Sequence, residues 1–209
     1  MTDASALQPH DLLWGLPACA LPADAPSWAV AVTKLGQPVV VRRALVAMGQ
    51  VAVGVRGKSR DQRYATQMRL ADIQRRVSPE QLISDREGSD DWPALIALKQ
   101  IKPVMEASGL VWGVSGSAGF ELASGCAALH ADSDLDLILR TPAPFGRANA
   151  AQLLARLEHA VCRIDVQLQL PDGGVSLREW AGTAQQVLIK TDHGPRLTRA
   201  PWRCVEQAA

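Results

Sequence analysis

A pair of aspartates one residue apart constrains this chain more than any other feature. Residues 134–139, DLDLIL, alternate carboxylates with aliphatic side chains and then continue apolar, which predicts a β-strand. Side chains alternate faces along a strand, so Asp134 and Asp136 share one face and the leucines take the other. Two carboxylates side by side repel each other unless a cation lies between them, and their oxygens are ligands that suit Mg²⁺.

A glycine-serine turn precedes this strand. Residues 111–114 are an apolar run that predicts a buried strand, and the Gly116-Ser117 turn after it leads into AGFELA, the start of a predicted helix. The first turn of a helix offers unpaired backbone N–H groups and the positive end of the helix dipole. The turn therefore predicts a phosphate-binding site, although Ser117 is also a good helix cap, and both roles use the same donors.

A third carboxylate follows in residues 164–170, IDVQLQL. The aliphatic side chains form one face of a predicted strand, and Asp165 lies on the opposite face. If this strand pairs next to residues 134–139, all three carboxylates converge beside the Gly-Ser turn, which is the layout that two-metal phosphoryl or nucleotidyl transfer requires. The competing interpretation is that these aspartates are only the solvent-facing side of their strands.

These motifs resemble a known superfamily. A Gly-Ser turn, an Asp-x-Asp strand and a later lone Asp occur in that order in nucleotidyltransferases, and Gly116-Ser117, Asp134, Asp136 and Asp165 match them. GVSGSAGFELASG followed by SDLDLILR is further similar to the phosphoribosyl-dephospho-CoA transferases of malonate decarboxylase, the holo-acyl-carrier-protein synthases. The resemblance extends along most of the chain through these segments: HDLLW at 10–14, VGVRG at 53–57 with Arg60, Gln62 and Arg63, SLREW at 176–180, KT at 190–191 and GPRL at 194–197.

The resemblance implies a fold and a reaction. The fold is α+β, with a nucleotidyltransferase-type mixed sheet, flanking helices and a smaller N-terminal α/β domain. The reaction transfers the phosphoribosyl-dephospho-CoA group from 2'-(5''-triphosphoribosyl)-3'-dephospho-CoA to a serine of the apo acyl-carrier subunit of malonate decarboxylase, releasing diphosphate. Asp134 and Asp136 then hold two Mg²⁺ ions, Asp165 binds the second ion and is the candidate acceptor of the serine proton, and Gly116-Ser117 hold the leaving diphosphate.

Two alternatives remain at this stage. One is a different nucleotidyltransferase that uses ATP or a related nucleoside triphosphate, since only the substrate separates the two enzymes. The other is a non-catalytic module that binds a carrier protein or a nucleic acid. Three intact carboxylates argue against a silent module, and a nucleic-acid partner is not expected because Tyr64 is the only aromatic residue of the basic stretch.

Positive charge is concentrated in the N-terminal half. Nine Lys or Arg occur from residue 42 to residue 76, against two Asp, although the net charge of the chain is +1. Such a run usually forms a solvated face. A polyanionic substrate or an acidic carrier protein favours a binding role instead, and the candidate residues are Arg56, Lys58, Arg60 and Arg63. Lys190 is either a surface lysine or a contact to substrate phosphate.

The length and composition predict two small domains. With 209 residues and 47% hydrophobic content, the chain can bury a substantial core. The polar segment SDREGSDD predicts a linker between domain 1–84 and domain 91–209. There is no membrane-length apolar run and no signal-peptide pattern at MTDASALQPH, so a cytoplasmic protein without a membrane partner is expected. The four cysteines are scattered, which predicts reduced, mostly buried thiols.

Local patterns predict the remaining elements. Residues 12–14 are expected to be an apolar anchor, Ser176 and Glu179 a capping box, Gly173-Gly174 a turn, and Trp180 and Trp202 packing residues. Helices are predicted at 27–36, 73–84 with a break at Ser78-Pro79, 93–108 and 149–161; strands are predicted at 38–45, 50–56 and, as the last strand, 186–191.

Overall fold

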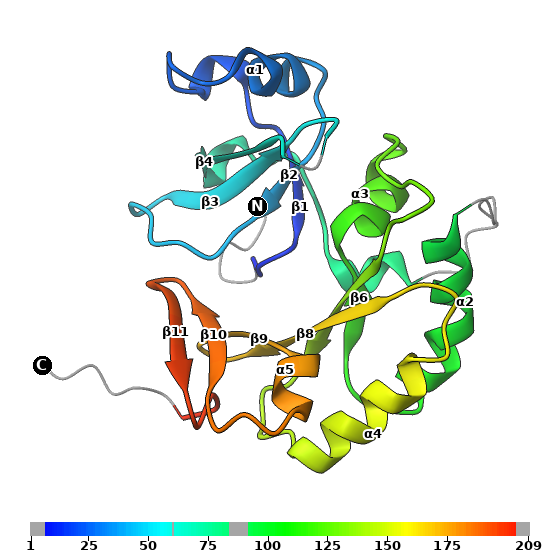
Figure 1. Ribbon diagram of the computed structural model, residues 1–209. Coiled ribbons are helices and arrows are strands. Elements are labelled where there is room, and N and C mark those ends of the chain that lie inside the picture. The colour runs from blue at the N-terminus through cyan, green and yellow to red at the C-terminus, as the bar shows by residue number, and fades with distance from the viewer. Residues whose placement is uncertain (1–6, 60, 84–91, 204–209) are drawn as a thin grey trace, which may run out of the picture.

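The computed structural model describes residues 7–59, 61–83 and 92–203. Within these ranges the chain forms two β-sheets and five α-helices, which confirms the α+β content expected from the sequence (Figure 1). The sheet of strands β1 to β5 lies above the sheet of strands β6 to β11 in this view. The predicted linker, residues 84–91, lies outside the described residues. No helix in the described ranges is long and apolar enough to cross a membrane.

The N-terminal sheet is antiparallel, with strand order β4-β3-β2-β1-β5. Helix α1 covers one face, because Ala29 and Val32 pack with Leu13, Val53 and Met68 in one buried cluster. The bounds are β1 (Leu12–Trp14), α1 (Ser27–Lys34), β2 (Val39–Val41), β3 (Gln50–Arg56), β4 (Arg63–Arg69) and β5 (Arg75–Val77).

Sequence reasoning missed strands β1 and β4 in this part of the chain and predicted a helix where β5 lies. Leu12 and Leu13 are buried, as expected for an apolar anchor, but residues 12–14 also form β1, an inner strand between β2 and β5, because a three-residue strand is defined by its partners and not by its own pattern. Strand β4 lies inside the basic stretch, where exposed charged side chains at the sheet edge hid the alternation. The predicted helix at 73–84 is β5 followed by the short 3-10 helix η4 (Pro79–Leu82), whose Ser78 capping box is present with Gln81.

The C-terminal sheet has the order β11-β10-β9-β8-β7-β6. Strands β7 and β8 are parallel and joined by α4, as a parallel pair requires a crossover, while the other pairs are antiparallel. The bounds are α2 (Pro93–Glu106), β6 (Trp112–Val114), α3 (Gly116–Ser124), β7 (Leu135–Arg140), α4 (Arg147–Leu157), β8 (Ile164–Leu170), β9 (Gly173–Ser176), α5 (Leu177–Ala181), β10 (Val187–Thr191) and β11 (Gly194–Thr198).

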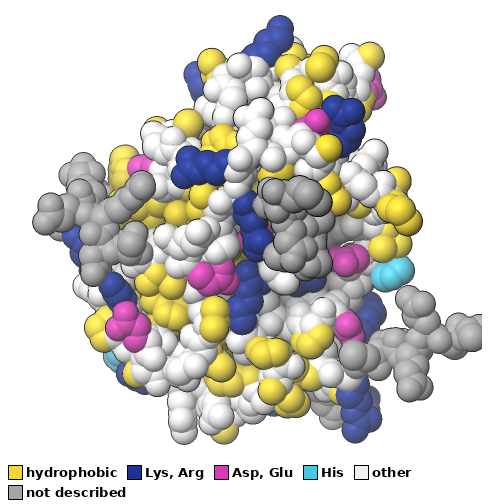
Figure 2. Space-filling view, turned by 180° about the vertical axis from the view of Figure 1, so that it is seen from behind, with side chains coloured by type: hydrophobic (Ala, Val, Ile, Leu, Met, Phe, Trp, Pro, Cys, Tyr) yellow, Lys and Arg dark blue, Asp and Glu magenta, His cyan; other side chains and the backbone are white. Residues whose placement is uncertain are grey.

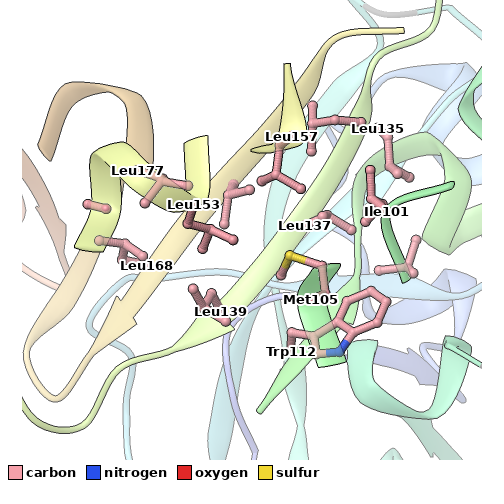
Figure 3. Close-up of a cluster of buried hydrophobic side chains, with 14 of the residues drawn as sticks. Ile101, Met105, Trp112, Leu135, Leu137, Leu139, Leu153, Leu157, Leu168 and Leu177 are labelled. Atoms are coloured by element: carbon pink, nitrogen blue, oxygen red, sulfur yellow. The ribbon is translucent and has the colours of Figure 1, made fainter. Parts of the chain in front are cut away.

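Helices α2 and α4 cover one face of this sheet. Leu135, Leu137 and Leu139 of β7 are buried against Ile101 of α2 and Leu153 of α4 in one apolar cluster (Figure 3). Because side chains alternate, the intervening residues of β7 and β8 point to the opposite face, toward the N-terminal sheet. The strands predicted at the two aspartate motifs, and the helices at 93–108 and 149–161, are therefore confirmed with small shifts in their bounds.

Three expectations at the C-terminal end are also wrong. Gly173 and Gly174 lie in β9 and not in a turn: a Cβ on Gly173 would lie 2.6 Å from Ile189 Cγ1, so this glycine permits close strand packing. Ser176 makes no side-chain cap, because Glu179 Oε1 accepts a hydrogen bond from Leu188 N instead. A further strand, β11, follows β10 and pairs with it as a hairpin.

The tryptophan and cysteine expectations had different outcomes. Trp180 and Trp202 pack edge to face, with ring centroids 5.1 Å apart against the C-terminal core, which confirms their packing role. Cys19, Cys126 and Cys162 are free thiols, but Cys19 is exposed and the other two are half-buried. The expectation of mostly buried thiols is wrong for the described cysteines, because none of them lies in a core helix or strand.

The two sheets are joined by an apolar cluster and by ion pairs. Leu12 and Val77 of the N-terminal sheet pack with Phe120 of α3. Arg140 Nε of β7 donates to Glu80 Oε1 of η4 at 2.8 Å, and both side chains are largely buried. Figure 2 shows basic and acidic side chains gathered across the middle of the molecule on the face opposite to that of Figure 1. This junction places the uncovered face of one sheet against the uncovered face of the other.

Candidate active site

Three carboxylates meet on the uncovered face of the C-terminal sheet. The parallel register of β7 and β8 sets Asp136 directly beside Asp165, and Asp134 lies just before β7. One carboxylate oxygen from each of the three lies within 4.8 Å of the other two, and all three side chains are half-buried. The convergence predicted from the two sequence motifs is therefore present.

The donor set of this cluster suits a metal ion. All three ligand atoms are carboxylate oxygens, the chemistry that hard divalent cations prefer. Part of the negative charge is balanced by Arg163, which donates to Asp165 Oδ1 at 2.9 and 3.1 Å. Arg163 was missed from the sequence, although it lies two residues before Asp165, at the spacing that puts strand side chains on one face. The cluster can hold a metal ion.

Gly116 is required by the carboxylate beside it. Its φ is +61°, in the left-handed region, and a Cβ there would lie 1.9 Å from Asp136 Oδ2. Ser115 N donates to the backbone oxygen of Asp136 at 2.9 Å, which fixes the turn against β7. The start of α3 is thereby held in contact with the carboxylate cluster, and its unpaired N–H groups lie beside it.

Arg56 crosses from the N-terminal sheet to this turn. Its Nη2 donates to Ser117 Oγ at 2.7 Å, and its guanidinium lies 5.3 Å from the centroid of the Phe120 ring. Burial, together with the nearby charge of Arg63, lowers the pKa of Arg56 to about 10, and the charge of Asp136 opposes this shift. Arg56 is still protonated at neutral pH and brings a positive charge to the start of α3.

These groups line one cavity of about 530 Å³ between the two sheets. Most of the site residues predicted from the sequence lie in its wall, namely Asp134, Asp136, Asp165, Gly116, Ser117, Arg56, Lys58 and Arg63. Arg60 lies outside the described residues. Lys190 is exposed on β10 and is not part of the wall.

Sequence reasoning missed several polar residues of the wall: His10, Arg42, Tyr64, Ser115, His130 and Ser133. His10 belongs to the HDLLW segment, which supported the family resemblance but was given no role in the site. Asp132 also lines the cavity, from a turn before β7. A cavity that joins carboxylates, a helix start and several cations has the chemistry of a transferase that acts on a phosphorylated substrate.

Comparisons with known proteins identify the family. The model of the phosphoribosyl-dephospho-CoA transferase MdcG C-terminal domain matches residues 81–201, and that of the MdcG N-terminal domain matches residues 8–79. Proteins named phosphoribosyl-dephospho-CoA transferase are 61% identical in Pseudomonas syringae pv. tomato, over 99% of both chains, and 50% identical in Azotobacter vinelandii, over 94% of both. A Pseudomonas putida relative of the same name, from strain GB-1, is 57% identical over 98% of this chain and 100% of its own.

The chain belongs to the family of phosphoribosyl-dephospho-CoA transferases, and it is a transferase. The resemblance stated from the sequence motifs is confirmed. No solved structure matches the chain. The two family models meet between residues 79 and 81, ahead of the predicted linker, and the division into domains 1–84 and 91–209 stays a prediction.

Proposed function

We propose that this chain transfers the phosphoribosyl-dephospho-CoA group from 2'-(5''-triphosphoribosyl)-3'-dephospho-CoA to a serine of the apo acyl-carrier subunit of malonate decarboxylase, with release of diphosphate. Family membership supports the substrate. The observation that carries the mechanism is the convergence of Asp134, Asp136 and Asp165 within 4.8 Å beside Gly116.

We assign the C-terminal part to the nucleotidyltransferase fold. Its support is the order of elements: β6, the Gly-Ser turn that opens α3, and the adjacent strands β7 and β8 that carry the three carboxylates. In this fold the helix start and the carboxylates act on the same triphosphate. The close approach of Gly116 to Asp136 fits that shared task.

Asp134, Asp136 and Asp165 are the proposed ligands of two Mg²⁺ ions. The all-oxygen donor set and the short mutual distance fit this choice. Bound there, the ions supply charge neutralisation on the triphosphate and on the attacking oxygen. The half-buried position of the cluster keeps the carboxylates partly away from water, which strengthens their interaction with a cation.

The remaining residues bind the leaving group and accept the proton. The serine oxygen attacks the α-phosphorus, the bond to the β-phosphate oxygen breaks, and diphosphate leaves. Backbone N–H groups at the start of α3, Ser117 Oγ and the Arg56 guanidinium hold that diphosphate. Asp165 takes the serine proton through the oxygen that Arg163 does not occupy, because Arg163 donates only to Oδ1.

The test is the mass of the carrier after reaction. Purified protein with Mg²⁺ should add one phosphoribosyl-dephospho-CoA group to the apo carrier, and Asp134→Asn or Asp136→Asn should abolish this addition while the protein remains folded. Asp172→Asn, at an exposed turn after β8, is the matched control and should react like wild type. A near wild-type rate in either site variant would contradict the proposed role of the carboxylates.

The same measurement separates this function from its nearest alternative. A nucleotidyltransferase that uses ATP would add an adenylyl group to the carrier. If ATP served as well as or better than the triphosphoribosyl donor, or if the donor gave no product, the substrate assignment would be wrong even though the carboxylate site stood.

The basic wall of the cavity is the proposed contact for the anionic partners. Lys58 and Arg63 line the cavity from the N-terminal sheet side, next to Arg56. Charge reversal at both residues should raise the KM of the donor or of the carrier, and wild-type affinity should fall with salt. Unchanged KM values for both substrates would return these side chains to an ordinary solvated face.

A further inference from the structure

The cavity has a second end that the proposed chemistry does not use. The carboxylates, Gly116 and Ser117 belong to the C-terminal part of the chain, and this part of the wall is called the carboxylate end; the second end is the part formed by His10, Leu12, Val40, Arg42 and Gly54 of the N-terminal sheet and the turn before it. A ligand that fills only the carboxylate end leaves this wall without a partner. This wall combines the apolar side chains of Leu12 and Val40 with one imidazole and one guanidinium.

The floor of the second end is a flat row across three strands. Leu12 is opposite Val40, and Val40 is opposite Gly54, so the three residues lie side by side on one face of the sheet. Phe120 packs at the Leu12 end of this row, and Val40 beside it is half-buried. Gly54 has no side chain, and the aliphatic carbons of Arg42 lie over the row there, 3.1 and 3.6 Å from where a Cβ would be, so a planar group reaches the floor when this flexible side chain moves aside.

His10 is held above this floor in an uncommon conformation. Its φ is 77°, and among the described residues it is the one non-glycine with positive φ. The turn that presents it is fixed by the fully buried Asp11, whose Oδ2 accepts from Gln8 N at 2.8 Å and pairs with Arg76 at 2.8 Å. Such a conformation costs on the order of 1–3 kcal/mol, persists only where its surroundings impose it, and occurs often at functional sites.

The imidazole of His10 is neutral at physiological pH. Burial, together with the charges of Arg43, Arg140 and Lys190, lowers its pKa from 6.5 to about 4. Its Nε2 lies 3.3 Å from Nε2 of Gln167, an amide nitrogen that can only donate. With Nε2 as the acceptor, Nδ1 carries the proton, and His10 brings one N–H donor to the wall of the cavity.

We propose that the second end of the cavity binds the adenine and its ribose in the dephospho-CoA part of the donor, with the base on the floor at Gly54 and His10 as a hydrogen-bond donor to it. This inference rests on the proposed function. The base is planar and carries ring nitrogens that accept hydrogen bonds, and Arg42 at the rim suits the diphosphate attached to its ribose.

This placement gives the enzyme a means to reject ATP. In the donor, an additional ribose separates the triphosphate from the adenosine, whereas ATP has only the adenosine ribose between base and triphosphate. With the triphosphate at the carboxylate end, the base of ATP stops one sugar short of the floor at Gly54. Discrimination then comes from the length of the cavity and not from the carboxylates.

The test uses binding of two fragments by the full chain. Dephospho-CoA probes the second end, and inorganic triphosphate with Mg²⁺ probes the carboxylate end, each measured by calorimetry. Gly54→Val places a side chain over the floor. The three atoms nearest to a Cβ at Gly54 are Arg42 Cδ at 3.1 Å, Arg42 Cγ at 3.6 Å and Val40 O at 4.0 Å, and the flexible Arg42 side chain can shift to accept it. Gly146→Val, where nothing lies within 4 Å of a Cβ, is the matched control.

We expect Gly54→Val to weaken dephospho-CoA binding about tenfold or more and to leave triphosphate binding unchanged. His10→Asn is the second variant, since Asn tolerates positive φ, and it should also weaken only dephospho-CoA. If His10 had only a structural role, His10→Asn would weaken the binding of both fragments, and this result would overturn the assignment. So would wild-type affinity for dephospho-CoA in both variants, or no binding of it by wild type.

Failure of the proposed function would look different. It would leave wild-type protein unable to modify the carrier, while dephospho-CoA still bound and still responded to Gly54→Val. If wild-type protein modified the carrier but dephospho-CoA binding did not respond to Gly54→Val, only the placement of the base would be refuted.

Discussion

Replacement of Gly116 by alanine isolates the contact between the turn and the carboxylate cluster. Gly116 has a φ of +61°, and alanine in this region costs about 1–2 kcal/mol. The added Cβ would also lie 1.9 Å from Asp136 Oδ2, where real contacts are essentially never under 3.0 Å. Asp136 or the start of α3 therefore has to move by about 1 Å, a displacement that can lower a reaction rate about 100-fold.

The same helix provides a matched control. Gly125 ends α3 with a φ of +72°, so Gly125→Ala carries a similar backbone strain, but nothing lies within 4 Å of the new Cβ. Both variants should lose about 1–2 kcal/mol of unfolding free energy in urea, and Gly116→Ala should lose more because of the contact. Only Gly116→Ala should lose transferase activity and Mg²⁺ affinity.

The activities of the two alanine variants separate an effect on Asp136 from an effect on the stability of α3. Transfer of the prosthetic group is measured by the mass of the carrier, and Mg²⁺ binding is measured by calorimetry on the same preparations. Equal activity of the two alanine variants would refute the argument that Asp136 needs a glycine beside it. Loss of activity in both would point to the stability of α3 and not to the carboxylate.

Other predictions concern single contacts. Arg56→Met removes the donor to Ser117 Oγ and should lower kcat/KM by about 10–100-fold without unfolding the protein, and a wild-type value would contradict its place at the leaving group. The pKa of His10 is lowered from 6.5 to about 4, so the unfolded chain binds the extra proton in this window and wild-type stability should fall as the pH drops from 6.5 to 4. Urea titrations across that range should show a loss of about 3 kcal/mol that His10→Asn largely removes; identical slopes would contradict the shift. Gly173→Ala should destabilise the protein by about 1–3 kcal/mol, because its Cβ would meet Ile189 Cγ1 at 2.6 Å, and an unchanged urea midpoint would show that β9 and β10 can separate freely.

The carboxylate site could be predicted because its information is local. Alternation along residues 134–139 and 164–170 fixes the facing of each aspartate, and the structure confirms that the two strands are neighbours. The second end of the cavity could not be predicted in this way. Leu12, Val40 and Gly54 become a floor only through pairing between strands far apart in the sequence, and His10 enters the wall through a turn imposed by the buried Asp11.

The errors in secondary structure have a common physical cause. Strands β1 and β5 have three residues each, too few for a periodic pattern, and both are defined by pairing with each other. The extended conformation of the β9 glycines and the hydrogen bond of the Glu179 side chain are likewise set by neighbouring strands. Local sequence preference predicted the long helices and the strands with a clear apolar pattern, and it failed for segments whose conformation is set mainly by a partner strand.

The register of β7 and β8 ties the site to the core. Leu168 is buried at 0% exposure on the helix side, while Asp165 faces the cavity from the other side of the same strand. A slip of β8 by one residue would move Asp165 into the apolar layer and expose the aliphatic set. Packing errors and an incomplete site would therefore arise together, so after refolding from urea the recovered activity should rise in step with the recovered folded protein.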